Sequence, residues 1–536
     1  MSGTSTAYAS GGPLGAVESM LWVGDIAREG AARFAQRTAT VFAENGRSLS
    51  YAQLDALSRS FVAIVRQRGL EPGARIGWLA RNDDLYYVAM IGAALSGVVL
   101  VPINWRLSAP EVAYQLEDAG AAWFLADHGL QALADAANAL LPERLPLDLI
   151  DPPGAPGLWQ QLQQTAPVDP QPGPTDADQT LLQVYTSGTT GKPKGVLISH
   201  YALSMARHAE LQSPDWGYWT EGGISLSAMP NFHMGGLSWV LMGLVRFATV
   251  VISMDPGPAN MLALMRRYKV DYNFIVPTVI RSIVDELLAT GEDVPPTRGI
   301  YYGAMSMDAG LLTQAMGLFG CRFGHFFGMT EVTGAATYLP PDQHNPDKPE
   351  RLRSVGKPYL GMEFEIRDPL RNRLACFEHG EIWIRTPTLM QGYWNRPDQT
   401  NEVVVDGWYA TGDGGYMDPD GYVFLTDRIK DMIVSGGENV YPVEVESALL
   451  QHPAVLSAAV IGIPDRQWGE VVAAVIELRD GHYVDEESLR AFVRERLAGF
   501  KCPRRILFGP LPRTGSGKIQ RGVVRAQLRE RFLEKA

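Results

Sequence analysis

The stretch that is most informative about the fold is Val184–Val196, which reads V-Y-T-S-G-T-T-G-K-P-K-G-V. This stretch contains four Ser/Thr hydroxyls, three glycines and two lysines, and the apolar runs on either side of it predict two flanking strands. Glycines let backbone N–H groups approach an anion closely, hydroxyls add donors, and lysines add positive charge. We therefore expect a phosphate-binding loop between two strands, with a solvated Gly/Ser/Thr linker as the alternative.

The loop differs from the Walker P-loop of nucleotide hydrolases. That motif requires G-x-x-x-x-G-K-S/T followed at once by a helix. Here the residue five positions before Gly191 is Thr186, and Lys192 is followed by Pro193. A P-loop hydrolase is therefore not the predicted class.

Length and composition predict a multidomain globular protein. A chain of 536 residues is too long for one compact core and suggests about three structural units. The composition is 46% hydrophobic and 20% charged, and the net charge of −12 gives no electrostatic support for general nucleic-acid binding. The three cysteines are odd in number and far apart, so they form neither a disulfide framework nor a CxxC metal site. We expect a cytoplasmic protein, and the sequence does not decide between a monomer and a homodimer.

No targeting or membrane-spanning segment is predicted. The N-terminal leader has no basic and apolar regions of the secretory kind. The most apolar window, Val88–Ile103, contains Pro102 and predicts a buried helix followed by a core strand.

Helices and strands alternate along most of the chain. Apolar spacing predicts a helix over Tyr51–Arg68 with Ser50 as its N-cap, followed by strands and helices in the order expected of parallel sheets covered on both faces. Residues 151–178 are rich in Pro, Gly, Gln and Asp and predict a surface connection rather than a packed element. Short strand-like runs predict a small antiparallel subdomain at about 353–428. After Pro442, two helices and two strands predict a small α+β domain, with the second helix over Glu486–Ala498.

Further motifs follow the phosphate loop in a fixed order. They are A-M-P-N-F-H-M-G-G-L (228–237), I-Y-Y-G-A-M-S-M (300–307), G-H-F-F-G-M-T-E (324–331), Y-A-T-G-D-G-G-Y around Asp413, T-D-R-I-K-D-M-I-V-S-G-G-E-N-V-Y-P (426–442) and P-R-T-G-S-G-K-I-Q-R around Lys518. From about Ser50 to Lys518 the chain resembles the adenylate-forming superfamily of acyl-CoA synthetases, luciferases and peptide-synthetase adenylation domains.

The resemblance implies an α/β multidomain fold. It implies a large N-terminal adenylation domain, residues 1–429, of two helix-flanked sheets plus a small β-barrel-like subdomain. A small mobile α+β lid domain, residues 430–536, would rotate about a hinge at Lys430.

The resemblance also implies a nucleotide site. Glu331 would hold the Mg²⁺ that bridges the ATP phosphates, which suits an ion that takes few carboxylates plus phosphate oxygens. Thr186, Glu331, His233 and Lys518 would be the catalytic residues, with Lys518 steadying the attacking carboxylate and the α-phosphate. The implied ATP and AMP contacts are Thr186, Ser187, Gly188, Thr189, Thr190, Gly191, Lys194, Gly303, Ala304, Phe327, Gly328, Thr330, Asp413, Arg428 and Lys518.

The acid would bind in a mainly apolar pocket. The candidate residues are His233, Met234, Leu237, Tyr302, Met305 and Phe326. Taken alone, His233 reads as a satisfied loop histidine, whereas the resemblance assigns it to the carboxylate pocket. Tyr302 and Phe326 both stand where relatives often carry glycine. Because no Arg or Lys is among these candidates to pair a second carboxylate, we expect an apolar monocarboxylic acid, aliphatic rather than aromatic.

The second substrate is expected to be coenzyme A, held by the lid domain. The implied contacts are Ser435, Gly436, Gly437, Glu438, Trp468, Phe500 and Arg504. Cys502 stands where aryl-CoA ligases carry a further basic residue, which shifts the expected phosphate contacts toward Lys501 or Arg505. No carrier-protein domain follows Ala536, which favours a free thiol.

The resulting prediction is an ATP-dependent acyl-CoA ligase. An enzyme that loads a separate carrier protein is the alternative. A luciferase-like oxygenase is a weaker possibility that light emission or O₂ uptake would distinguish. A nucleotide-binding regulator without catalysis is also weaker, because it would require loss of Glu331 or Lys518 and both are present.

Overall fold

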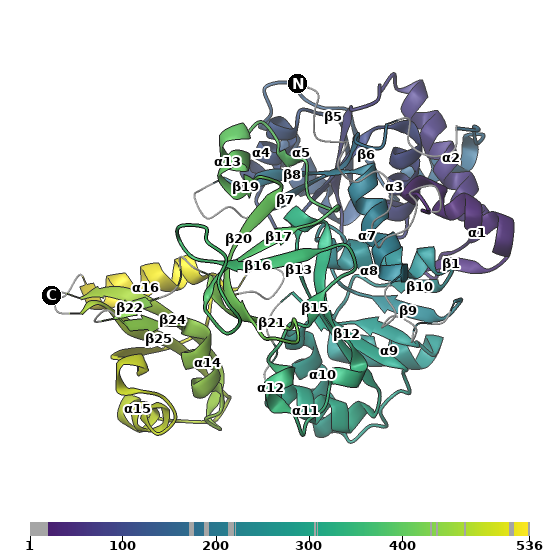
Figure 1. The fold of residues 1–536 in the computed structure, drawn as a ribbon. Coiled ribbons are helices and arrows are strands. Elements are labelled where there is room, and N and C mark those ends of the chain that lie inside the picture. The colour runs from purple at the N-terminus through teal and green to yellow at the C-terminus, as the bar shows by residue number, and fades with distance from the viewer. Residues whose placement is uncertain are drawn as a thin grey trace.

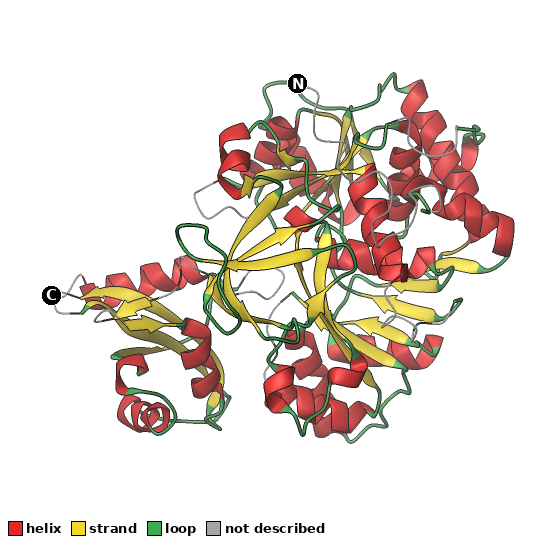
Figure 2. Ribbon diagram, in the orientation of Figure 1, coloured by secondary structure: helices red, strands yellow, loops and turns green. Residues whose placement is uncertain are grey.

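A computed structural model describes most of the chain. The described residues are 20–170, 176–186, 192–212, 219, 221–304, 307, 309–428, 431, 433–435, 438–465, 468–513 and 519–533. Figure 1 shows a large N-terminal body and a smaller C-terminal unit beside it, and Figure 2 shows that both mix helices with sheets.

The large body contains two extended sheets. The nine-stranded sheet has the spatial order β15 (Lys357–Pro358), β14 (Gly334–Leu339), β13 (Arg322–Met329), β12 (Gly299–Gly303), β11 (Tyr272–Phe274), β9 (Ile224–Ser227), β10 (Thr249–Ile252), β1 (Thr38–Phe42) and β2 (Ser48–Ser50). The seven-stranded sheet has the order β18 (Gly392–Tyr393), β8 (Lys194–Ser199), β7 (Thr180–Thr186), β4 (Val99–Ile103), β3 (Arg75–Leu79), β5 (Ala121–Ala126) and β6 (Leu147–Leu149). The central strands of both sheets pair in parallel, as the helix–strand alternation predicts.

Helices pack between the two sheets and on their outer faces. One apolar cluster joins residues of both sheets with α1 (Ile26–Phe34), α2 (Tyr51–Gln67), α3 (Leu85–Ser96), α7 (His200–Gln212) and α8 (Met234–Val245). On the outer faces, α9 (Pro258–Tyr268), α10 (Pro277–Thr290) and α11 (Ala309–Phe319) pack on the nine-stranded sheet, and α4 (Ala109–Ala119) and α5 (Gln131–Ala139) on the seven-stranded sheet (Figure 1). The helices α7 and α8 therefore lie in the middle layer.

Local predictions hold where capping signals are strong. Ser50 caps α2 with a reciprocal Gln53 contact, and Gly97 ends α3 in the left-handed conformation. The apolar window forms the fully enclosed α3 followed by β4, as predicted. No helix in the described part of the chain is long and apolar enough to cross a membrane.

Three boundary predictions need correction. The segment 151–178 is not only a surface connection, because it contains α6 (Leu158–Gln164), whose Leu158 and Leu162 are buried in the main core. The helix expected to reach residue 498 is α15 (Glu486–Arg494) and ends four residues earlier. The interval 353–428 also lends strands to both large sheets, since β15 extends the nine-stranded sheet and β18 the seven-stranded one.

The rest of that interval forms the predicted antiparallel unit. Its strands are β16 (Glu363–Arg367), β17 (Gly380–Arg385), β19 (Val404–Val405), β20 (Trp408–Met417) and β21 (Val423–Arg428), all antiparallel. The short helix α12 (Pro349–Leu352) directly precedes this interval, and α13 (Pro397–Val403) lies within it.

The C-terminal unit is one five-stranded sheet between helices. Its elements are β22 (Ile433–Ser435), β23 (Glu438–Val440), α14 (Pro442–Leu450), β24 (Val455–Asp465), β25 (Gly469–Leu478), α15, β26 (Arg505–Phe508) and α16 (Arg521–Leu533). The helices α14 and α15 share one apolar cluster with the sheet, and α16 shares the cluster on the other face. The ring of Tyr441 stacks on His379 of the large body, with centroids 5.4 Å apart.

Buried histidines predict that the fold is sensitive to acid. Burial lowers the pKa of His200, His233 and His344 to about 4 and that of His325 to about 3. The unfolded chain takes up these protons near pH 6.5, so between about pH 4 and 6.5 the folded state binds fewer protons than the unfolded state. The free energy of unfolding is therefore fully retained above pH 6.5 and falls as the pH is lowered, by up to about 3 kcal/mol per histidine. Melting temperatures measured between pH 7.5 and 4.5 test this expectation.

His344 provides the variant for this test. Its Nδ1 lies 3.0 Å from the Pro340 carbonyl oxygen and its Nε2 lies 3.1 Å from the Tyr302 hydroxyl, so the neutral ring is bonded at both nitrogens. His344→Gln should flatten the acid slope, whereas the exposed control His482→Gln should leave it unchanged. An unchanged melting temperature from pH 6.5 to 4.5 in the unmodified protein would contradict the prediction.

Candidate active site

The predicted phosphate loop joins two antiparallel strands. Thr186 ends β7, Lys194 begins β8, and the two residues pair directly across the strands. The flanking strands were therefore predicted correctly. The loop residues Ser187, Gly188, Thr189, Thr190 and Gly191 lie outside the described residues.

One tyrosine connects this loop to Glu331. The Tyr393 hydroxyl donates a hydrogen bond of 3.1 Å to Glu331 Oε1, and the Lys194 ammonium lies 4.5 Å from the centroid of the same ring. Tyr393 reaches this place because β18 pairs with β8, opposite Val196. Two residues predicted from distant motifs, Lys194 and Glu331, thus share one aromatic neighbour that the sequence did not single out.

Glu331 is held by a tight turn after β13. It lies in a short 3₁₀ turn, Thr330–Val332, that ends at Thr333 in the left-handed conformation. A Cβ on Gly328 would lie 1.8 Å from the Gly334 carbonyl oxygen, so this close approach of two strands requires glycine. The Glu331 carbonyl also accepts the Met390 N–H at 2.8 Å. The backbone of Glu331 is therefore held by the turn and by Met390, and its carboxylate by the Tyr393 hydroxyl.

The predicted ribose contacts face each other across two strands. Asp413 on β20 pairs with Arg428 on β21, although the Arg428 side chain lies outside the described atoms. Burial, with the carboxylates of Glu331 and Asp413 adding to it, raises the pKa of the nearby Tyr409 hydroxyl far above its usual range. Tyr409 therefore stays protonated, and its hydroxyl lies within electrostatic reach of both acidic residues.

His233 is the N-cap residue of α8. Its position is set by Asn82, which accepts the Asn231 N–H at 3.0 Å and donates to the Met229 carbonyl at 3.0 Å. Because burial and the Arg106 charge lower the pKa of His233 to about 4, the ring is neutral near pH 7. A neutral imidazole can position a carboxylate by hydrogen bonding and adds no charge of its own.

The acyl-pocket prediction needs one correction, at Tyr302. This residue lies on the outer face of β12, stacked on His325 with centroids 4.5 Å apart and bonded to His344. Its neighbour Tyr301 lies on the inner face with Met234 and Leu237 and stacks on Phe326 at 5.5 Å. Successive strand residues point to opposite faces, so Tyr302 does not lie with Met234, Leu237 and Phe326, whereas Tyr301 does. Met305 lies outside the described residues.

Aromatic rings cover this inner face. Trp239 of α8 packs against Tyr301 at 5.4 Å and against Phe274 at 5.7 Å, and Phe326 packs on Tyr338 at 5.2 Å. Gly303 ends β12 beside them, where a Cβ would lie 2.6 Å from the Phe326 carbonyl oxygen. The next residue, Ala304, adopts the left-handed conformation with φ of 68°.

Charged residues that the sequence reasoning missed lie on α7 and at the end of α8, near Tyr301. Arg207 and Glu210 of α7 are buried, and Arg207 Nη2 donates to Glu210 Oε1 at 2.7 Å. Arg246, at the end of α8, interacts electrostatically with Glu210 and Tyr301. Arg207 and Glu210 have the i, i+3 spacing of an ordinary surface ion pair on a helix. For this reason nothing in the sequence indicated that the pair is buried.

Two of the predicted coenzyme A residues, Trp468 and Arg504, are in contact on the C-terminal unit. The Arg504 guanidinium lies 4.6 Å from the centroid of the Trp468 ring, and Phe500 is 37% exposed nearby in sequence. Lys501 is already paired, since its ammonium lies 2.7 Å from both carboxylate oxygens of Glu444. Cys502 is buried in the core of the unit, so a basic side chain there would have to leave the core.

The tip of the predicted hairpin is only partly described. Ser435 and Glu438 pair across β22 and β23 as the hairpin signal predicts. Gly436, Gly437, the hinge residue Lys430 and the lysine Lys518 lie outside the described residues.

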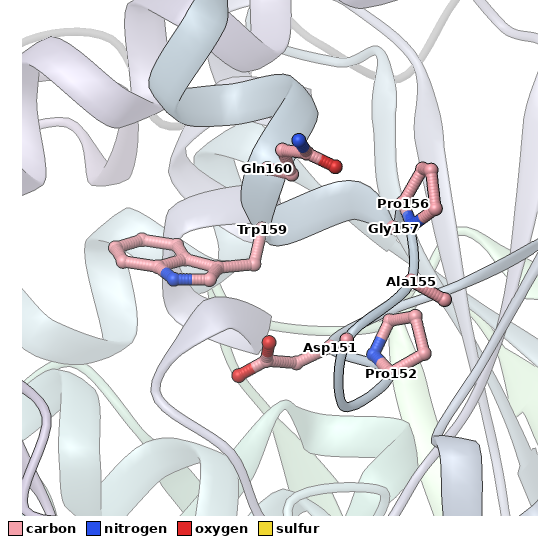
Figure 3. Close-up of a pocket in the computed structure, with 8 residues that line it drawn as sticks. Asp151, Pro152, Ala155, Pro156, Gly157, Trp159 and Gln160 are labelled. Atoms are coloured by element: carbon pink, nitrogen blue, oxygen red, sulfur yellow. The ribbon is translucent and has the colours of Figure 1, made fainter.

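A separate cavity of about 330 Å³ lies at the start of α6. Figure 3 shows that its walls come from the start of α6, with Trp159 and Gln160, and from the preceding loop, with Asp151 and Pro152. Its one ionisable group, Asp151, is 2.5 Å from the Arg47 guanidinium. This cavity has no group from the predicted site and we assign it no part in the chemistry.

Comparison with known proteins identifies the family. The sequence model for AMP-binding enzymes matches residues 27–394, and that for the AMP-binding enzyme C-terminal domain matches residues 444–518. The chain belongs to the AMP-binding enzyme family. As an AMP-binding enzyme it is an AMP-forming acid–thiol ligase, which confirms the predicted superfamily and enzyme class.

Its relatives differ in acid and in thiol acceptor. This AMP-binding enzyme is 37% identical to a fatty acid–acyl-carrier-protein ligase, ScoC, of Streptomyces coeruleorubidus, over 91% of the chain and 92% of that protein. It is 34% identical to a feruloyl-CoA synthase of Amycolatopsis sp, over 91% and 95%. Among solved structures it matches the o-succinylbenzoate CoA synthetase MenE of Bacillus subtilis in complex with its acyl-adenylate intermediate, with a TM-score of 0.81, 29% identity and coverage of 94% and 97%. The two-part α/β fold is confirmed by this match.

Proposed function

We propose that this enzyme is an ATP-dependent acyl-CoA ligase acting on a monocarboxylic acid. The observation that carries the proposal is the convergence of Lys194, Tyr393 and Glu331 at the end of the phosphate loop. A cation, a hydroxyl and a carboxylate at that point suit a polyphosphate with its counter-ion, and no protein nucleophile is needed for adenylation.

In the first step, a carboxylate oxygen of the acid attacks the α-phosphorus of ATP. The bond from that phosphorus to the bridging oxygen breaks, and pyrophosphate leaves as acyl-AMP forms. Thr186 and Lys194 contact the phosphates, Asp413 accepts from the ribose hydroxyls, and His233 orients the carboxylate. Lys518 stabilises the negative charge that builds up at the α-phosphate.

A magnesium ion fits the donor set at Glu331. The carboxylate is a hard oxygen ligand oriented by the Tyr393 hydroxyl, and nucleotide phosphates would supply further oxygens. The ion would neutralise phosphate charge during adenylation.

In the second step, the thiol of coenzyme A loses its proton and attacks the acyl carbonyl, and AMP leaves. Rotation of residues 430–536 about Lys430 against residues 1–429 would withdraw Lys518 and bring the 435–438 hairpin to the site. The stacked pair of Trp468 and Arg504 supports coenzyme A as the thiol, because a ring can stack on adenine and a guanidinium can pair with phosphate.

We propose that the acyl group of the acid is planar, that is, unsaturated or aromatic. The inner face offers the rings of Trp239, Tyr301 and Phe326, and such faces favour an unsaturated or aromatic acyl group over a saturated chain. This reverses the preference for an aliphatic acid that we drew from the sequence.

Loading of a carrier protein is the second candidate. It is favoured by the 37% identity to ScoC, whose name describes an acyl-carrier-protein ligase. An assay with Mg-ATP and a panel of fatty, benzoic and cinnamic acids, supplied in parallel with coenzyme A or with a phosphopantetheinylated carrier protein, separates the two. Thioester and AMP in equal amounts with coenzyme A support the proposal, and thioester only with the carrier protein overturns it.

Trp468→Ala should raise the KM for coenzyme A by roughly 5- to 20-fold while changing kcat little. The reason is that adenine stacking binds the thiol substrate without touching the reacting atoms. Steady-state kinetics at saturating acid and ATP measure the effect. Tyr483→Ala is the control, because that ring lies on the same unit and is 84% exposed. An unchanged KM in the Trp468 variant would exclude this surface as the coenzyme A site.

A further inference from the structure

A buried polar cluster joins α7 to α8 beside the acyl face. We define it as Arg207, Glu210 and Ser238, which are 1%, 4% and 9% exposed. Arg207 Nη1 donates to the Ser238 carbonyl oxygen at 2.7 Å, and Arg207 Nη2 donates to Glu210 Oε1 at 2.7 Å. Two helices of the middle layer are therefore joined by a charged network rather than by apolar packing alone.

Within the described part of the chain, each member of the cluster keeps one polar atom without a hydrogen-bond partner. These atoms are Arg207 Nε, Glu210 Oε2 and Ser238 Oγ, and all three are buried. A buried donor or acceptor left unsatisfied costs about 1–3 kcal/mol, so three such atoms in one place cost more than a purely structural link would justify. The cluster has the composition of a site that a ligand completes.

The cluster lies close to the active-site turn. Ser238 follows His233 by five residues on the same helix end. A Cβ on Gly334 would lie 3.1 Å from Ser238 Oγ and 3.9 Å from Arg207 Nη2, and Gly334 pairs with Met329 at the base of the turn that carries Glu331. The neighbouring residue Trp239 belongs to the aromatic face. The cluster therefore borders the region where the acyl group is proposed to bind.

We infer that the acid carries a hydroxyl group at the end remote from its carboxylate, and that the Arg207–Glu210–Ser238 cluster binds this hydroxyl. The inference rests on the proposed function and deepens it. A hydroxyl both accepts and donates, so it can accept from Arg207 Nε–H and donate to Glu210 Oε2 or Ser238 Oγ. A second carboxylate would instead meet the charge of Glu210.

The environment of Glu210 agrees with a hydroxyl partner. Burial raises the pKa of Glu210 to about 7, and the charges of Arg207 and Arg246 oppose this rise. Near neutral pH the carboxyl group can therefore accept or donate a hydrogen bond. A substrate hydroxyl can donate to the ionised Glu210 carboxylate or accept from its protonated form, whereas a ketone can only accept from the protonated form.

Matched pairs of acids test the inference. We expect kcat/KM for 4-hydroxycinnamate to exceed that for cinnamate, or kcat/KM for ω-hydroxydecanoate to exceed that for decanoate, by roughly 10-fold or more. Pyrophosphate release reports adenylation of each acid and does not depend on the thiol acceptor. If no acid releases pyrophosphate, the proposed function fails. If acids are activated but neither pair shows a preference for the hydroxyl, only this inference fails.

Ser238→Ala is the decisive variant, because its hydroxyl bonds to none of the described residues and its loss should not unfold the helix. It should lower the preference for the hydroxylated acid about 5-fold or more, with little change for the unsubstituted acid. Glu210→Gln should do the same, with its melting temperature reported alongside. The control is Ser58→Ala on α2, which removes another buried serine hydroxyl without a partner.

Two results would overturn the assignment. If both variants change the melting temperature but leave the hydroxyl preference intact, the cluster is only a structural link between α7 and α8. If the enzyme prefers decanedioate to ω-hydroxydecanoate, the cluster binds a second carboxylate instead.

Discussion

Lys518→Ala is expected to lower the rate of adenylate formation by at least about 100-fold, because a positioned charge at a developing oxyanion supplies several kcal/mol of transition-state stabilisation. The rate of thioester formation from preformed acyl-AMP and coenzyme A should fall by less than about 3-fold, because the proposed lid rotation would withdraw this lysine before the second step. Pyrophosphate release measures the first half-reaction, and thioester formation from synthetic acyl-AMP measures the second.

The separation of the two half-reactions makes this prediction specific. A variant that merely misfolds would lose both steps, and the exposed control Lys348→Ala should lose neither. Near-normal adenylation by the Lys518 variant would contradict the assignment of the catalytic lysine. An equal loss in both steps would contradict the proposed rotation about Lys430.

Much of the fold could be predicted because local signals and periodicity agree. The capping residues of α2 and the left-handed Gly97 fix helix ends directly in the sequence. The strands β7 and β8 could be placed because apolar runs border a stretch that cannot form a helix or a strand. By contrast, α6 was missed because its two buried leucines sit among glutamines in a Pro- and Gly-rich segment.

The sequence could not predict which face of the parallel sheet each residue of β12 points to. Both faces of β12 are covered by helices, so Tyr301 and Tyr302 are equally buried and no polar–apolar alternation tells them apart. Only the three-dimensional arrangement shows that Tyr301 packs with Phe326 while Tyr302 packs with His325. The assignment of Tyr302 to the acyl pocket was wrong for this reason.

Long-range pairings explain the other omissions. Tyr393 enters the site because β18 pairs with β8, nearly two hundred residues earlier in the chain. Arg207 and Glu210 are buried because α7 lies between two sheets, whereas a helix with charged residues at i and i+3 is usually exposed on that side. Motifs could therefore single out candidate nucleotide contacts, but not the residues that pack beside them, such as Tyr393, Arg207 and Glu210.

Glu331→Gln is expected to lower kcat/KM for adenylate formation by about 100- to 1,000-fold. Glutamine has nearly the same shape and can still accept the Tyr393 hydrogen bond, so the turn after β13 should be kept. What it lacks is the negative charge that binds a divalent ion beside the phosphates. Titration of Mg²⁺ at fixed ATP should show half-saturation at a higher concentration in the variant.

Two further variants separate this charge effect from positioning. Tyr393→Phe removes the hydroxyl that orients Glu331 and leaves its charge, so its rate should fall only about 3- to 10-fold. Glu350→Gln, an exposed residue on α12, should have no effect on either the rate or the Mg²⁺ dependence. If Glu331→Gln and Tyr393→Phe show equal losses with an unchanged Mg²⁺ titration, Glu331 acts by holding Tyr393 against Lys194 and not by binding the metal. In that case the tyrosine would be the residue that shapes the phosphate site.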